Sequence, residues 1–362
     1  MDTKKTPLFN EHNKLGARCA SFGGWLMPIQ YKGIIAEHIW TRSSASLFDI
    51  CHMGEFKLKL RPGENSLEKI LTINLSKMPA MSCRYGFMLN DDGGIIDDVI
   101  IYKEKEDEFM LVVNAATTAG DFTHISQYID ANARIEDISP DTCKIDLQGP
   151  LSREVLEVIV GEDINKLRYY TFGFFQLLGQ RCIISRTGYT GELGYELYIS
   201  KDKVIELWEL LLKDKRVEPA GLGARDTLRL EVGYPLYGAD IDLNRNPIEA
   251  GLGSFVDFEK DFKGRTSLEK FRTAGTAEKM IGFITKSRRA PRHNYKIYNN
   301  DNQIGIVTSG SFSPSLSCGI GMGYVKKGAN IDGNQILLIE GNVEIEAQIT
   351  KRPFYKSGTA RI

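Results

Sequence analysis

A change of pattern near residue 277 constrains the fold most, because the chain reads as almost purely β beyond that point. Apolar residues alternate with polar ones from Val343 to Thr350, which predicts a strand with one buried face. A Gly341-Asn342 turn joins this strand to residues 335–339, so the two segments form a predicted hairpin. Residues 299–302 predict another turn ahead of a further strand.

Before residue 275 the chain mixes strands with helices. Apolar residues recur at helical spacing over 151–159, after the Gly149-Pro150 break, and again over 204–211. Residues 270–279 contain Gly275 and few large apolar side chains, so this segment is the predicted linker. A chain of 362 residues has room for two or three domains. The pattern therefore predicts an α+β region over 1–275 and an all-β domain over 276–362.

Charge and cysteine spacing exclude several classes of protein. The 46 basic and 47 acidic residues leave a formal charge of −1, which disfavours a nucleic-acid binder that neutralises phosphates. The six cysteines form no C-x-x-C pair, so zinc ribbons and most iron–sulfur sites are disfavoured and no metal is expected. No apolar run is long enough to span a membrane, and no leader precedes the first residues. We expect a reduced, cytoplasmic protein.

The common phosphate-binding and hydrolase motifs are missing. Residues 221–226 carry two glycines of a dinucleotide fingerprint, but an aspartate stands where the third glycine should be. There is no P-loop, no G-x-S-x-G elbow and no H-E-x-x-H pair. His52 beside Cys51 invites a metal interpretation, yet adjacent residues of an extended segment point to opposite faces, so we interpret His52 as structural.

Charged residues interrupt apolar patterns at three places. Asp97 and Asp98 lie within a strand of strong β-formers, and period-two geometry sends their side chains to opposite faces. One of the two is either a bracing residue or a carboxylate held in an apolar site for proton handling. Glu196, in a strand after a glycine-rich turn, needs a donor, which could be a ligand with paired N–H groups or a nearby arginine. Arg225 begins a helical run, where it could bind an anion or brace Asp226 or Glu231.

Taken in order, these segments resemble the aminomethyltransferase family, the T-protein of the glycine cleavage system. The resemblance runs nearly end to end and is carried by these segments: Thr6-Pro7-Leu8, Gly24-Trp25, Met27-Pro28, 48–55 (FDICHMGE), 93–98 (GGIIDD), 112–115 (VVNA), 147–150 (LQGP), 186–192 (RTGYTGE), 221–231 (GLGARDTLRLE), 236–238 (LYG), 247–252 (PIEAGL), 309–314 (SGSFSP) and 351–355 (KRPFY).

The resemblance implies both a fold and a reaction. The fold would be a folate-binding region of two intertwined α/β domains around a central hole, followed by a C-terminal antiparallel β-barrel. The enzyme would release ammonia from the aminomethyl group on the lipoyl arm of H-protein and pass the one-carbon unit to tetrahydrofolate. The products would be 5,10-methylenetetrahydrofolate and dihydrolipoyl H-protein.

The resemblance also assigns roles to individual residues. Asp98, the second acid of its pair, matches the family's catalytic aspartate near N5 and N10 of the folate. Glu196 matches the glutamate that pairs with the pterin ring, and Arg225 matches a folate-contacting arginine. The other positions that align with the folate pocket are Tyr189, Asn114 and Tyr85, with Tyr355 as a late contact.

The sequence departs from the family pattern at two positions. Cys51 stands where the family usually has serine, and we interpret the change as a packing adjustment. Asn294 occupies a usual glycine position, where asparagine tolerates left-handed backbone angles. Two other readings of the same fold stay open. One is a folate-dependent demethylase of small sulfur or nitrogen compounds. The other is a folate-binding iron–sulfur maintenance factor, against which residues 261–265 (DFKGR) lack the expected cysteine.

Overall fold

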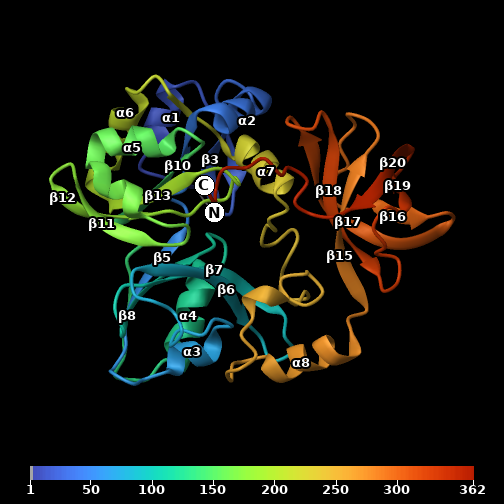
Figure 1. Ribbon diagram of the computed structural model, residues 1–362, viewed down its shortest axis with the longest axis horizontal. Coiled ribbons are helices and arrows are strands. Elements are labelled where there is room, and N and C mark those ends of the chain that lie inside the picture. Colours follow the sequence, from blue (N-terminus) through green and yellow to red (C-terminus); the bar gives the residue numbers. More distant parts are fainter. Residues whose placement is uncertain (1–2) are drawn as a thin grey trace.

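The computed structural model describes residues 3–362 and arranges them as two α/β parts beside a barrel (Figure 1). A six-stranded sheet forms the first part, in the order β11-β12-β13-β10-β4-β14. Its strands are β4 (Ala45–Asp49), β10 (Thr142–Gln148), β11 (Phe172–Leu177), β12 (Gln180–Ser185), β13 (Gly194–Ser200) and β14 (Val217–Pro219). The helices of this part are α1 (Phe9–Lys14), α2 (Ile34–Ser43), α5 (Ser152–Val160), α6 (Val204–Leu212) and α7 (Leu222–Glu231).

A five-stranded sheet forms the second part, in the order β6-β7-β8-β5-β9. Its strands are β5 (Gly54–Lys59), β6 (Ser82–Leu89), β7 (Ile95–Lys103), β8 (Glu108–Val113) and β9 (Arg134–Asp137), and its helices are α3 (Ser66–Ile70) and α4 (Thr118–Tyr128). A small sheet near the N-terminus pairs β3 (Trp25–Gln30) with β1 (Lys4–Lys5) and β2 (Arg18–Phe22).

The two parts are intertwined in sequence. Strands β4 and β10 are antiparallel neighbours, with Ile145 opposite Asp49, yet the whole five-stranded sheet lies between them along the chain. The predicted pair of intertwined α/β domains is therefore confirmed. The two predicted helices are also present, as α5 and α6. Leu156 of α5 and Leu207 and Trp208 of α6 belong to the same hydrophobic core as the six-stranded sheet.

The C-terminal region closes into a six-stranded barrel. Its strands are β15 (Glu278–Thr285), β16 (Lys296–Asn299), β17 (Asn302–Ser313), β18 (Cys318–Lys326), β19 (Gln335–Glu340) and β20 (Val343–Thr350). The predicted hairpin is β19–β20, and its alternating residues Ile345, Ala347 and Ile349 point into the barrel core. Asn294 has a φ of 71°, so it adopts the left-handed conformation that its sequence position suggested.

The predicted linker over 270–279 is wrong in its first half. Helix α8 (Arg265–Ala274) occupies that segment, because Leu268 is buried against Phe87 and Leu89 and gives the helix an apolar face. Gly275, with a φ of 82°, ends the helix, and β15 begins three residues later. The division into 1–275 and 276–362 stays a prediction. Residues 351–362, here named the C-terminal tail, leave the barrel and contact the first part through Glu192 and Glu231.

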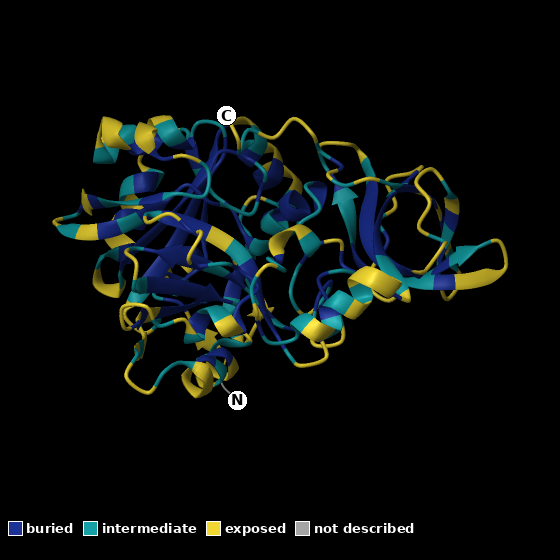
Figure 2. Cartoon of the chain, turned by 60° about the horizontal axis from the view of Figure 1, so that its bottom comes forward, coloured by how far each residue is buried: buried dark blue, intermediate teal, exposed yellow. Residues whose placement is uncertain are grey.

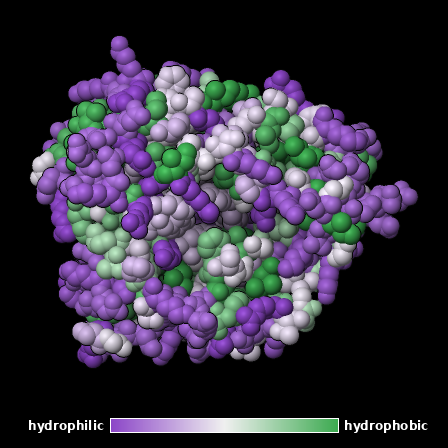
Figure 3. Space-filling view, in the orientation of Figure 1, coloured by the Kyte–Doolittle hydropathy of each residue, from purple (hydrophilic) through white to green (hydrophobic). Residues whose placement is uncertain are grey.

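Burial follows the sheets. Figure 2 shows the strands mostly dark blue and the outer faces of the helices yellow. Figure 3 shows a largely hydrophilic face with a hollow near its centre, between the two α/β parts and the barrel. Among the helices of residues 3–362, none is long and apolar enough to cross a membrane.

Candidate functional site

Asp98 lies on β7 and is held by two neighbouring side chains. The Tyr85 hydroxyl of β6 donates to Asp98 Oδ2 at 2.8 Å, and the Asn114 side-chain amide donates to Asp98 Oδ1 at 2.7 Å. Asn114 follows the end of β8, which pairs with β7 through Ile100 and Val112. Tyr85, Asp98 and Asn114 are all half-buried. The structure thus brings three of the predicted site residues into direct contact.

Asp97 is fully buried, although it is the immediate neighbour of Asp98. Its two carboxylate oxygens accept from the backbone N–H and the side-chain amide of Asn114, at 2.9 and 2.8 Å. Asp98 is half-buried while Asp97 is buried, but one Asn114 amide reaches both carboxylates, so their expected placement on opposite faces stays a prediction. A register shift near Met88 and Leu89 leaves Ile96 without a paired residue on β6.

Burial and like charge make Asp98 a weak acid. Burial raises its pKa to about 7, and the neighbouring Asp97 carboxyl contributes in the same direction. Burial and the Asp121 carboxyl raise the pKa of Asp97 well above its usual range. A half-buried carboxyl with a pKa near 7 exchanges protons readily at neutral pH.

Glu196 lies on β13, directly opposite Asp146 of β10. Lys144 Nζ lies 3.2 Å from Glu196 Oε1, and Thr187 donates to Oε2 at 2.8 Å. Burial alone would raise the pKa of Glu196, but the Lys144 charge and the Thr187 hydrogen bond lower it below its ordinary value. The internal ion pair foreseen as an alternative exists, with a lysine in place of the expected arginine.

Arg225, in the first turns of α7, points toward the six-stranded sheet. Its guanidinium donates to Asp146 Oδ2 at 2.5 Å and lies over the Tyr189 ring, 4.9 Å from the centroid. In the described part of the chain, neither Asp226 nor Glu231, the alternative partners considered for Arg225, pairs with it. Successive residues of a helix are turned by about 100°, so Asp226 reaches Arg229 instead. Glu231 binds Arg42 from α2.

The two remaining predicted residues, Tyr189 and Tyr355, lie in different surroundings. Tyr189 donates to the Pro235 carbonyl and stacks on Tyr234. Tyr355, in the C-terminal tail, lies under Arg42 with 4.1 Å between the guanidinium carbon and the ring centroid. Within residues 3–362, no hydrogen bond joins the Tyr355 side chain to the other predicted site residues. Its contact with folate stays a prediction.

Sequence reasoning missed several groups beside the site. Lys144 and Asp146 carry the two ion pairs, and their alternation with Gln148 in a strand was a visible signal of one polar face. Tyr170 has a φ of 62°, a strained value for an aromatic residue, and its phenol contributes to the raised pKa of Tyr85. Nothing local in the sequence marks that backbone angle.

Cys51 and His52, the pair that invited a metal interpretation, are both buried. The Cys51 thiol donates to the Lys144 carbonyl at 3.3 Å, and burial with the nearby Cys143 raises its pKa well above the ordinary value. Burial lowers the pKa of His52 to about 4, so the imidazole is neutral at pH 7. Across residues 3–362, no three His, Cys, Asp or Glu side chains gather closely enough to hold a metal ion.

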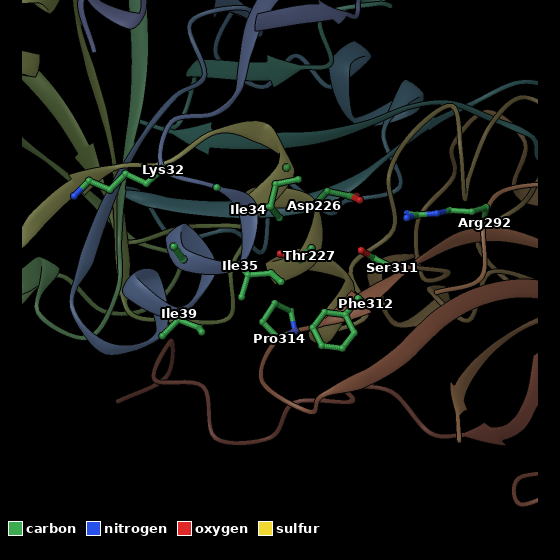
Figure 4. Close-up of a pocket in the computed structure, with 13 residues that line it drawn as sticks. Lys32, Ile34, Ile35, Ile39, Asp226, Thr227, Arg292, Ser311, Phe312 and Pro314 are labelled. Carbon is green, nitrogen blue, oxygen red and sulfur yellow. The ribbon is translucent and has the colours of Figure 1, made fainter. Parts of the chain in front are cut away.

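A separate groove lies between α2, α7 and the barrel (Figure 4). Ile34, Ile35 and Ile39 of α2 face Phe312 and Pro314 across a space of about 820 Å³. One face of α7 lines the groove with Gly223, Asp226 and Thr227. Arg225 points from the same helix toward Asp146 of the sheet and does not line the groove. None of the predicted site residues lines this groove.

Comparison with known proteins agrees with this geometry. The GCVT N-terminal domain family matches residues 8–260, and the glycine cleavage T-protein C-terminal barrel domain family matches residues 278–356. An aminomethyltransferase of Halothermothrix orenii is 46% identical over 97% of this chain and 99% of its own. One from Caldanaerobacter subterraneus subsp. tengcongensis is 40% identical over 98% of this chain and 96% of its own.

A solved structure extends the agreement to three dimensions. The crystal structure of glycine cleavage system aminomethyltransferase T from Bartonella henselae superposes with a TM-score of 0.94 at 33% identity, covering 99% of both chains. Sequence and structure therefore match along the whole length, and the chain belongs to the aminomethyltransferase family, the T-proteins of the glycine cleavage system.

Proposed function

We propose that Asp98 is the catalytic residue of a tetrahydrofolate-dependent aminomethyltransferase and that lipoylated H-protein is its transient donor. One observation carries the assignment: Asp98 is a half-buried carboxyl, held by Tyr85 and Asn114, with a pKa of about 7. Members of the family use tetrahydrofolate as co-substrate, and the chain is a one-carbon transferase of this kind.

The polar groups of the site fit a reduced pterin. Glu196 is ionised and lies between Lys144 and Thr187, so it offers carboxylate oxygens to the adjacent N–H groups of a pterin ring. Arg225, anchored by Asp146, offers the planar donors that suit a carboxylate or carbonyl of the folate. Tyr189 supplies an aromatic face beside that guanidinium.

The reaction needs positioning and proton transfer more than a protein nucleophile. Tetrahydrofolate supplies N5 and N10, which form two bonds to the transferred carbon while its bonds to nitrogen and sulfur break. One folate proton leaves with the ammonia and the other with the lipoyl thiol, so the atoms balance as ammonia and dihydrolipoyl H-protein. Asp98 would hold or move a proton beside these nitrogens, with Tyr85 and Asn114 fixing its orientation.

The decisive assay measures ammonia release from aminomethylated H-protein, with and without tetrahydrofolate. We expect release to depend on lipoylated H-protein and to rise strongly when the folate is added. Methyl transfer from a small sulfonium compound or methylamine, with none from H-protein, would move the assignment to a folate-dependent demethylase. We also propose a cytoplasmic location, which the six free cysteines support.

A further inference from the structure

A buried acid that the proposed mechanism does not use lies behind the Asp98 site. Asp121, in the first turn of α4, is 1% exposed, and among residues 3–362 neither of its carboxylate oxygens accepts a hydrogen bond of ordinary geometry. The Thr117 hydroxyl faces this carboxyl but donates to the Asn114 carbonyl at 3.0 Å. The Asp97 and Asp121 carboxyls are neighbours, because Asp121 raises the pKa of Asp97 both through its charge and through a hydrogen bond between the two side chains. A buried charge without a partner is costly, so this contact needs an explanation.

Asp121 is the last member of a chain of contacts that starts at Asp98. Asn114 donates from one side-chain amide to Asp98 and to Asp97, at 2.7 and 2.8 Å. Its backbone N–H donates to the other oxygen of Asp97 at 2.9 Å. Asp97 therefore orients Asn114, which orients Asp98, and the Asp121 carboxyl lies beside Asp97.

Two buried carboxyl groups in contact cannot both be ionised at low cost. Burial raises the pKa of Asp121 to about 6, and it raises the pKa of Asp97 well above its usual value. The other polar groups facing the pair are Thr117 on the turn before α4, Tyr237 on the loop after α7, and Asp98 itself. None of these is a cation. One shared proton satisfies the pair, and the N-terminal end of α4 favours the single remaining charge.

We propose that Asp121 is a positioning residue that shares a proton with Asp97 and thereby fixes the Asn114 amide against Asp98. With the proton in place, Asp97 and Asp121 together carry one negative charge, and Asp97 accepts both Asn114 donors. Without it, the two carboxylates repel each other and Asn114 loses its fixed acceptor. The proposal rests on the proposed role of Asp98 and extends it to a residue that does not touch substrate.

Two variants of Asp121 separate proton sharing from simple packing. Asp121→Asn supplies an N–H to Asp97 permanently, whereas Asp121→Leu keeps a similar size and supplies none. We expect Asp121→Asn to keep kcat within about threefold at pH 7 and to retain more of it at alkaline pH than the wild type. We expect Asp121→Leu to lower kcat by about tenfold or more with little change in KM for tetrahydrofolate. Asp92→Asn, an exposed acid on the turn before β7, is the matched control and should behave as the wild type.

A stability measurement tests the shared proton without any assay of turnover. A carboxyl whose folded pKa is raised stabilises the fold less as pH rises from its unfolded pKa to its folded pKa. The thermal midpoint of Asp121→Asn minus that of the wild type should therefore increase between about pH 4 and pH 8. A difference that stays constant with pH overturns the proposal, as does an equal loss of kcat in both Asp121 variants. If the wild type releases no ammonia, the proposed function fails, while this pH-dependent difference still decides whether the proton is shared.

Discussion

Asp97 and Asp98 are chemically identical neighbours, and their surroundings give them different roles. Asn114 donates to both, but Asp97 receives two of its N–H groups and is fully enclosed, while Asp98 is half-buried and receives the Tyr85 hydroxyl. We propose that the buried acid acts through Asn114, whereas the half-buried acid, with a pKa of about 7, exchanges protons with a reactant. The difference arises from their neighbours, because Asp98 receives the Tyr85 hydroxyl whereas Asp97 lies beside the Asp121 carboxyl.

Asp98→Asn should lower turnover by about 10²–10⁴-fold, the contribution of a positioned proton-transfer group, while folate affinity changes little. Asp97→Asn should lower stability by about 1 kcal/mol, because it weakens the hydrogen bond from the Asn114 backbone, and should lower turnover less than Asp98→Asn, because Asp97 acts on Asp98 through Asn114. Steady-state turnover and the thermal midpoint of both variants test this. If Asp97→Asn loses turnover at normal stability while Asp98→Asn stays active, the two roles are reversed.

The ionisation of Asp98 should also appear in the pH profile of the wild type. If the carboxylate is the working form, turnover rises with pH through an inflection near 7, since the folded pKa is about 7. An inflection near 4, the ordinary value for an aspartate, would contradict the raised pKa. Asp98→Asn should remove the inflection, and the profile of the Asp92→Asn control should retain it.

Glu196→Gln should weaken tetrahydrofolate binding by about 1.5–3 kcal/mol, because the amide keeps the shape but loses charge-assisted hydrogen bonds to the pterin. The same change removes the ion-pair partner of the buried Lys144 ammonium, which then keeps the longer-range attraction of Asp146. Calorimetric titration should therefore measure the tetrahydrofolate affinity of the variant, and thermal unfolding should measure its stability. Unchanged affinity with lowered stability would assign Glu196 to the ion pair alone.

Helix α7 is the element that carries Arg225 to the site, and its close approach to β3 depends on glycine. A Cβ at Gly221 would lie 2.3 Å from the carbonyl carbon of Ile29, so any side chain pushes α7 away from that strand. Gly221 adopts an extended backbone conformation just before the helix, which other residues also accept. Contact with Ile29, and not backbone freedom, therefore requires the glycine.

Gly221→Ala should destabilise the protein by about 1–3 kcal/mol, the usual cost of overpacking, and should weaken folate binding because Arg225 moves with the helix. Gly120→Ala is the matched control, since a Cβ there meets no atom within 4 Å on the exposed side of α4. That substitution should stabilise by about 0.5–1 kcal/mol. Denaturant titration of both variants measures the free energy of unfolding. An unchanged value for Gly221→Ala would mean that α7 moves away from β3 at no cost.

Regular elements could be predicted from the sequence where the local pattern was strong. Helices α5 and α6 and the β19–β20 hairpin follow from spacing and turn residues alone. Helix α8 was missed because its buried contact, Leu268 against Phe87, joins segments far apart in the chain. The partners of Arg225 and Glu196 were misjudged for the same reason: Asp146 and Lys144 come from β10, a strand that the sequence does not place beside them. Choosing Asp98 over Asp97 needed the family resemblance.

Glu231, the last residue of α7, connects the first part of the molecule to the barrel and to the C-terminal tail. Its carboxylate accepts from Arg42 of α2 at 2.8 Å and from Ser313 and Ser315 of the barrel at 2.5 and 2.8 Å. Its backbone carbonyl accepts from Phe354 and Tyr355 of the C-terminal tail. One fully buried glutamate thus joins both large regions of the chain, and breaking such a network is costly.

Glu231→Gln should lower the free energy of unfolding by about 1.5–3 kcal/mol at neutral pH, the value of hydrogen bonds to a charged group. Burial alone would raise the pKa of Glu231, but the hydrogen bond from His38 and the Arg42 charge lower it to about 2, from an ordinary 4.5. A lowered folded pKa gives stability that is complete above the unfolded pKa and is lost as pH falls through the folded one. The difference in free energy of unfolding between wild type and variant should therefore be full at pH 7.5 and 5.5 and smaller at pH 3.5, measured by denaturant titration.

Glu346→Gln is the control, because Glu346 is an exposed barrel glutamate paired with Lys286. It should change stability little at any of these pH values, because solvent screens that pair. If Glu231→Gln lowers the free energy of unfolding by the same amount at every pH, Glu231 acts through its shape and not through its charge.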